Sequence, residues 1–221
     1  MSDWITFALP KGRIMQDSME LFSKIGITCP EMDDKSSRKL VFENPEQKFR
    51  FMAVRATDVP TYVEYGCADI GVVGKDTLLE QGKDLYEPLD LKFGYCRLVV
   101  AEPKELQEDD DPLNWSNIRV ATKYPNVTER YFAAKGVQVE LIKLYGSIEL
   151  APLVGLSERI VDLVSTGGTL KANGMVEVET IAEITTRLIV NRASLKTKHQ
   201  RISEIIDGLE PLIGDVVKIS Q

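Results

Sequence analysis

The chain has 221 residues, of which 43% are hydrophobic and 28% are charged, and this balance excludes disordered and fibrous classes of protein. The length fits one large α/β domain or two domains of about 100 residues each. Asp and Glu outnumber Lys and Arg by 34 to 27, and the net charge of −7 argues against a general nucleic-acid-binding protein, although it is compatible with a local anion site.

In chain order, short apolar runs alternate with amphipathic stretches. Strands are predicted at 4–9, 38–42, 49–54, 69–73, 95–101, 118–122, 137–142 and 160–164, followed by one long strand at 177–190. Helices are predicted at 14–25, 57–65, 75–80, 125–135, 147–155, 167–173 and 195–209. The alternation predicts an α/β protein with parallel sheets and helices on both faces. The acidic run at 103–112 is predicted to be a solvated loop.

Two of the predicted strands share one local pattern. Residues 96–100 (CRLVV) and 186–190 (TRLIV) both read Arg-Leu followed by two aliphatic residues. A two-lobed protein whose chain crosses twice between the lobes would place similar strands at the two crossings. Chance similarity between two buried strands explains the pattern equally well.

The chain carries no sequence signal for secretion or for a membrane. Its start, MSDWITFALPKGR, lacks the charged and apolar regions of a signal peptide, and no apolar run approaches the roughly 20 residues that span a bilayer. Cys29, Cys67 and Cys96 are widely spaced and form no CxxC pair, which is typical of reduced thiols. We therefore expect a cytoplasmic protein.

The segment 161–173, VDLVSTGGTLKAN, carries the most specific chemical signal. A predicted strand ends in a turn rich in Ser, Thr and Gly that opens a helix, where backbone N–H groups and the helix dipole favour an anion. The spacing indicates a phosphate-monoester site made by Ser165, Thr166, Gly167, Gly168 and Thr169. Asp162, at the strand end, would orient sugar hydroxyls or a metal-bound water. An ordinary strand-to-helix turn is the alternative, and neither a Walker A loop nor a dinucleotide fingerprint is present.

Further strand ends carry basic residues. Lys11, Gly12 and Arg13 follow the first strand, and cations at a helix start are electrostatically unfavourable unless an anion binds there. The alternative interpretation, that Lys11 and Arg13 are ordinary solvent-exposed side chains, has equal weight. Arg55 follows another predicted strand. The lone histidine, His199, lies in a basic segment remote from the glycine turns, which argues against a His-based triad.

Four segments of the chain together resemble the ATP phosphoribosyltransferase family. They are LPKGR at 9–13, VRATDVPTYVEYGCADIGVVGKD at 54–76, GYCRLVVAEP at 94–103 and DLVSTGGTLKANGM at 162–175. The resemblance implies that ATP and 5-phosphoribosyl-1-pyrophosphate condense to N1-(5-phosphoribosyl)-ATP and pyrophosphate, the first step of histidine biosynthesis. It also implies an α/β, two-lobed fold like that of type II periplasmic binding proteins, with a cleft between lobe I (1–92 plus 183–221) and lobe II (93–182).

The resemblance assigns roles to the candidate residues. Asp162 and the turn 165–169 would hold the ribose hydroxyls and the 5-phosphate of phosphoribosyl pyrophosphate, while Lys11, Gly12 and Arg13 would lie near the nucleotide and phosphates. Arg55 would hold the departing pyrophosphate, joined by Arg38 from a neighbouring subunit. Glu149 and Asp76 match family segments without so clear a role. Because Asp162 lacks an adjacent second acid, Mg²⁺ would be held mainly by substrate oxygens.

The length matches the short form of the family. That form implies a homodimer alone and a hetero-octamer with a regulatory subunit resembling histidyl-tRNA synthetase, so the chain alone is expected to be insensitive to histidine. Two alternatives remain. One is a non-catalytic two-lobed module of the same fold that binds small anions, and the other is a phosphoribosyltransferase that acts on a free base.

Overall fold

The computed structural model describes residues 3–33, 37–106 and 118–216 of the chain. The chain divides into two compact units. Unit 1 comprises Met1–Leu78, Gly82–Gly94 and Thr185–Gln221, and unit 2 comprises Leu79–Gln81 and Tyr95–Ile184. None of the helices in the described parts of the chain is long and apolar enough to cross a membrane.

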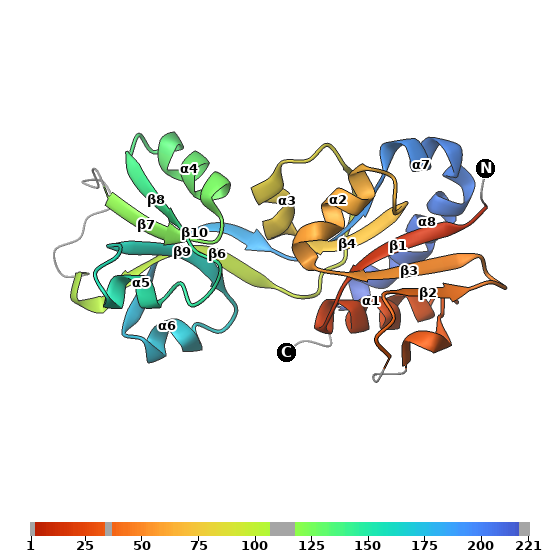
Figure 1. The fold of residues 1–221 in the computed structure, drawn as a ribbon, viewed down its shortest axis with the longest axis horizontal. Coiled ribbons are helices and arrows are strands. Elements are labelled where there is room, and N and C mark those ends of the chain that lie inside the picture. The colour runs from red at the N-terminus through yellow and green to blue at the C-terminus, as the bar shows by residue number, and fades with distance from the viewer. Residues whose placement is uncertain (1–2, 34–36, 107–117, 217–221) are drawn as a thin grey trace. The chain divides into compact units, whose positions relative to one another are not determined.

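Unit 1 is built on a six-stranded sheet with helices on both faces (Figure 1). From edge to edge its strands are β2 (Val41–Asn44), β3 (Phe49–Val54), β1 (Ile5–Pro10), β4 (Ile70–Gly74), β11 (Thr186–Val190) and β5 (Tyr86–Asp90). Its helices are α1 (Arg13–Ser23), α2 (Val59–Glu64), α3 (Lys75–Gln81, which ends in unit 2), α7 (Arg192–Thr197) and α8 (His199–Val216), with 3-10 turns at Pro30–Asp33 and Ala56–Asp58.

The residues of β1 show how one strand supplies both faces of this sheet. Phe7 is fully buried between α1 and α8, and its ring stacks on Phe51 with the centroids 5.0 Å apart. Ala8, the next residue, packs on the opposite face with Val59 and Val63 of α2. A strand buried on both faces is mostly apolar, and every residue of β1 is buried, with Thr6 its one polar residue.

Unit 2 is built on a five-stranded sheet. In order its strands are β10 (Met175–Ile184), β6 (Cys96–Pro103), β9 (Arg159–Val164), β7 (Ile118–Thr122) and β8 (Val139–Lys143). The helices α4 (Pro125–Ala134), on one face, and α5 (Leu150–Leu153) and α6 (Gly168–Ala172), on the other, cover it. The acidic run begins with the end of β6 and a 3-10 turn at Lys104–Leu106, and its residues from 107 onward lie outside the described residues.

The two sheets share one strand order. In unit 1 the central β1 has parallel neighbours β3 and β4, and β11 and β5 follow in antiparallel pairings. In unit 2 the central β7 has parallel neighbours β8 and β9, and β6 and β10 follow in antiparallel pairings. The strands with the shared Arg-Leu pattern, β6 and β11, occupy the same position in their sheets. β6 is the first strand after the chain passes from unit 1 to unit 2, and β11 is the first strand after it returns to unit 1.

Two of the expectations for the strands were wrong. The stretch 177–190 is not one strand, because the chain changes units at Thr185, between β10 and β11. No Gly or Pro separates β10 from β11, so the strand pattern continues across Thr185 and periodicity alone could not reveal the break. The sheets are mixed rather than parallel, because the strands at the crossings run antiparallel to their neighbours.

Candidate functional site

The glycine-rich turn lies at the carboxyl end of β9, as predicted. Gly167 adopts a left-handed conformation (φ 74°) and caps α6, which begins at Gly168. Ser165, Thr166, Gly168 and Thr169 are exposed. The first N–H groups of a helix have no intrahelical acceptor, and the two hydroxyls of Thr166 and Thr169 are accessible in the same turn, so this surface is chemically suited to an anion.

Gly167→Ala tests whether the shape of this turn matters. We expect the alanine to cost about 1–2 kcal/mol of unfolding free energy, because an L-residue is strained at this positive φ. The added methyl group itself meets only ordinary contacts, with Glu177 Oε1 at 3.5 Å. Gly168→Ala is the matched control, since Gly168 has no positive φ. Equal urea midpoints for the two variants would contradict the role given to Gly167.

Asp162 lies on the same strand and is partly buried. Burial raises the pKa of its carboxyl group, the Leu163 N–H (2.8 Å) opposes this rise, the Glu149 carboxylate adds to it and the Lys123 ammonium lowers it. Glu149 and Lys123 are therefore both near enough to act electrostatically on Asp162. The three come from one sheet edge, because β7, β8 and β9 are parallel and Lys123 and Glu149 follow β7 and β8.

Lys123 is a site residue that was not predicted from the sequence. A signal was available, since Lys123 follows a predicted strand directly, as Lys11 does. The proximity of Lys123 to Asp162 depends on strand order, which one sequence does not reveal.

Asp162→Asn is expected to separate binding from stability. The pKa of Asp162 is raised above its unfolded value, so the native state retains a proton at a pH where the unfolded chain has lost it, and the unfolding free energy falls as pH rises through that interval. The ionised carboxylate thus destabilises the fold at neutral pH. We expect Asp162→Asn to raise the melting temperature at pH 7, and this gain should vanish at a pH below the ordinary pKa range of Asp. For the reaction that the family resemblance implies, we expect Asp162→Asn to lower kcat/KM about 10- to 100-fold. A lowered melting temperature with full activity would contradict both parts.

In unit 1 the basic candidates gather at the ends of β1 and β3. The Lys11 N–H donates to the Val54 carbonyl at 3.0 Å, which places Lys11 beside Arg55 at the carboxyl edge of the sheet. Gly12 has φ 103°, a backbone conformation that favours glycine. Arg13 begins α1, and its side chain is 90% exposed, with Nε 3.5 Å from Oδ2 of Asp17. Lys11 and Arg55 are exposed as well, so three cations share this edge.

A pocket of about 1080 Å³ adjoins this edge in unit 1. Lys11 and Arg38 both line it, with Lys39 also on the wall. Its apolar lining includes Met15, Met19, Met32 and Phe42. The structure thus brings Lys11 and Arg38 of the same chain to one hollow, with apolar walls and a cationic lining.

The segment ADIGVVGKD has a structural explanation in large part. A Cβ on Gly71 would fall 2.7 Å from Val63, so glycine allows α2 to pack on β4. A Cβ on Gly74 would fall 2.2 Å from Oδ1 of Asp76, which lies in the first turn of α3, where an acid is favoured. Lys75 pairs with Glu87 at 2.6 Å.

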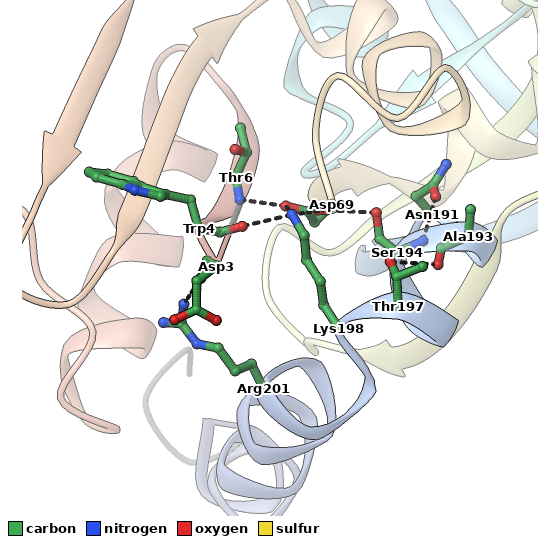
Figure 2. A network of polar contacts seen from close by, with 10 residues as sticks. All are labelled: Asp3, Trp4, Thr6, Asp69, Asn191, Ala193, Ser194, Thr197, Lys198 and Arg201. Atoms are coloured by element: carbon green, nitrogen blue, oxygen red, sulfur yellow. Dashed lines mark hydrogen bonds and ion pairs between the residues drawn. The ribbon is translucent and has the colours of Figure 1, made fainter. Parts of the chain in front are cut away.

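Asp69, in the same segment, is the centre of a buried network (Figure 2). Its carboxylate accepts hydrogen bonds from Thr6 N at 2.8 Å and Ser194 Oγ at 2.6 Å, and both oxygens lie 2.8 Å from Lys198 Nζ. Lys198 also donates to the Trp4 carbonyl at 2.7 Å. Because Asp69 precedes β4, the network lies at the amino ends of the parallel strands, opposite the edge that carries Lys11.

The amino-acid sequence of the chain matches known proteins over nearly its full length. A family model described as HisG, ATP phosphoribosyltransferase, matches residues 55–211. The chain belongs to the ATP phosphoribosyltransferase family. An ATP phosphoribosyltransferase from Syntrophotalea carbinolica is 84% identical over 97% of this chain and 98% of that protein, and one from Acidithiobacillus ferrooxidans is 56% identical over 95% and 98%.

Solved structures agree with this assignment. The ATP phosphoribosyl transferase (HisG:HisZ) complex from Thermotoga maritima superposes with a TM-score of 0.81 at 36% identity, over 96% of this chain and 99% of that chain. The periplasmic aliphatic sulphonate binding protein SsuA from Escherichia coli reaches 0.56 at 12% identity, over 95% and 72%, which bears on the fold alone. The predicted family, transferase class and two-lobed periplasmic-binding-protein-like fold are confirmed, and the first step of histidine biosynthesis is the role of this ATP phosphoribosyltransferase family.

Proposed function

We propose that this chain condenses ATP with 5-phosphoribosyl-1-pyrophosphate through the strand-end residues described above. N1 of the adenine forms a bond to ribose C1 while the bond from C1 to the pyrophosphate oxygen breaks, and the electron pair leaves with pyrophosphate. The product is N1-(5-phosphoribosyl)-ATP. The observation that carries the proposal is the exposed turn 165–169 beside Asp162 and Glu149, a combination suited to a phosphorylated sugar.

Unit 2 is assigned the phosphoribosyl pyrophosphate. Ser165, Thr166, Gly168 and Thr169 donate to the 5-phosphate, with Gly167 shaping the turn. Asp162 and Glu149 accept hydrogen bonds from the ribose hydroxyls, which requires Asp162 to be ionised in spite of its burial. Asp76 is not given a role in binding, because its place in the first turn of α3, where an acid is favoured, accounts for it.

Unit 1 is assigned the nucleotide and the leaving group. Lys11, Gly12 and Arg13 face the ATP phosphates, and the apolar wall of the neighbouring pocket suits a base. Arg55 and Arg38 bind pyrophosphate as negative charge grows on it. Fixing both substrates in line removes the entropic cost of their encounter, and fixed cations stabilise the developing charge without reorganisation.

Magnesium is proposed to enter with the substrate. In the described ranges, no group of three or more His, Cys, Asp or Glu side chains is placed to hold a metal ion. Mg²⁺ is usually held by one or two carboxylates together with substrate phosphates, and phosphoribosyl pyrophosphate supplies such oxygens. The ion would neutralise charge on the leaving pyrophosphate.

A regulatory partner is also proposed. The Thermotoga maritima structure is a HisG:HisZ complex, and its HisG-like chain has nearly the same extent as this one. We therefore assign this chain a HisZ-type partner, resembling histidyl-tRNA synthetase, in a hetero-oligomer, and a homodimer in its absence. Cys29, Cys67 and Cys96 form no disulfide within the described residues, as suits a reducing cytoplasm.

Pyrophosphate release tests the proposed function. The purified chain is mixed with Mg²⁺ and either ATP, phosphoribosyl pyrophosphate or both, and a fourth sample replaces ATP with free adenine. Release only when ATP and phosphoribosyl pyrophosphate are both present supports the proposal. Release with the free base indicates the alternative transferase, and saturable binding without release, also after addition of a HisZ-type partner, indicates the non-catalytic module.

A further inference from the structure

Lys123 lies next to Asp162 at the end of the central strand of unit 2. The parallel register of β7 and β9 pairs Thr122 with Val161, and continuing it by one residue sets Lys123 level with Asp162. The local backbone is fixed, because the Thr122 hydroxyl donates to the Val161 carbonyl at 2.7 Å and accepts from Tyr124 N at 2.9 Å. The residues on both sides of Lys123 are therefore held in place at this edge of the sheet.

The shared strand order gives Lys123 a counterpart. β7 in unit 2 and β1 in unit 1 are both central strands with parallel neighbours on each side, and each is followed directly by an exposed lysine, Lys123 or Lys11. The backbone at both places is held by the neighbouring parallel strand or the residue after it, since Lys11 N donates to Val54 O, and Leu144 N donates to the carbonyl of Thr122, which precedes Lys123. The same place in each unit thus presents one ammonium group.

The negative charge in this part of unit 2 favours a cation such as the Lys123 ammonium group. Asp162 and Glu149 are two carboxylates that repel each other, and a phosphorylated substrate would bring more negative charge to them. The Lys123 side chain is exposed, with Nζ 5.8 Å from the centroid of the Tyr124 ring, so it is accessible to a ligand. Lys75, which also follows a parallel strand, is instead paired with Glu87.

We propose that Lys123 is a substrate-binding residue that contacts a phosphate oxygen of phosphoribosyl pyrophosphate and offsets the negative charge of the neighbouring Asp162. The proposal rests on the assignment of this substrate to unit 2. The contact oxygen belongs either to the 5-phosphate or to the pyrophosphate group, which share this chemistry.

Lys123→Met removes the charge and keeps most of the apolar side chain. We expect the KM for phosphoribosyl pyrophosphate to rise about 10- to 100-fold, the kcat to change less than about threefold and the melting temperature to stay unchanged. Lys123→Arg should recover most of the affinity. Lys104→Met is the matched control, because Lys104 is exposed and follows β6, which runs antiparallel to β9 and so ends at the opposite edge. An unchanged KM in Lys123→Met with an active wild-type protein would overturn the proposal, whereas an inactive wild-type protein would instead contradict the proposed function.

The pH profile supplies a readout that a purely structural role would not move. The charged groups that act on Asp162 are Glu149 and Lys123, and loss of the cation leaves burial and Glu149 to raise the pKa of Asp162 further. The acidic limb of kcat/KM should therefore move to higher pH in Lys123→Met and not in Lys104→Met. Binding of ribose 5-phosphate and of inorganic pyrophosphate, measured separately, identifies the phosphate group. Weakened binding of either one supports the contact, and unweakened binding of both would refute it.

Discussion

Arg55→Ala is expected to lower kcat by about 10²- to 10³-fold, because it removes a fixed cation from the departing pyrophosphate. Arg55 is exposed at the end of β3, beside Lys11, and its backbone is extended (φ −76°, ψ 147°) before a 3-10 turn. No core packing depends on an exposed side chain, so the unfolding free energy should change by less than about 0.5 kcal/mol.

The measurement combines steady-state turnover at saturating ATP and phosphoribosyl pyrophosphate with urea unfolding. Arg192→Ala is the control, since Arg192 is an exposed arginine of unit 1 that pairs with Asp84 at 2.6 Å. Arg55→Lys should retain part of the turnover, because it keeps the charge and loses the planar fork. An unchanged kcat in Arg55→Ala would remove Arg55 from the mechanism.

Asp69→Ala is expected to destabilise the protein by about 3–5 kcal/mol, because it leaves a partly buried ammonium without its counter-charge. Asp69 is 4% exposed and joins Thr6 of β1 to Ser194 and Lys198 at the carboxyl-terminal helices (Figure 2). Its removal therefore loosens both the sheet and the attachment of α7 and α8.

Asp3→Ala provides the matched comparison. Asp3 pairs with Lys48 at 2.7 Å on the surface of the same unit, and an exposed, solvent-screened pair contributes little to stability. Turnover per folded molecule should survive in Asp69→Ala at low temperature, because the network lies at the opposite edge from Lys11. A loss of stability as small as that of Asp3→Ala would show that the network does not anchor the fold.

Local sequence contrast predicted some elements completely. The strands β3 and β7 begin and end at the predicted residues, because charged or polar residues border each apolar run: Lys48 and Arg55 around one, Asn117 and Lys123 around the other. The strand β5 was missed because it contains Pro88, which sequence rules confine to sheet edges, and β5 is an edge strand.

The residues of the candidate site also divide into those that the sequence predicts and those that only the fold brings together. The turn 165–169 and Asp162 could be found because their chemistry is contiguous in sequence. Asp69 lies in one of the segments that carry the family resemblance, and its role in the fold depends on partners more than a hundred residues away, Ser194 and Lys198. Lys123 meets Asp162 through strand order, which a single sequence leaves undetermined.

The interrupted course of the chain through unit 1 has a consequence for synthesis on the ribosome. β11 lies between β4 and β5, yet it is encoded after the whole of unit 2. Until β11 emerges, β5 lacks the strand with which it pairs, and the edge of β4 that β11 covers is open. Unit 2, whose strands are contiguous from β6 to β10, can complete its sheet first. We therefore expect unit 2 to complete its sheet before unit 1, and the uncovered edge of β4 to be open to pairing with other chains until the last strand is made.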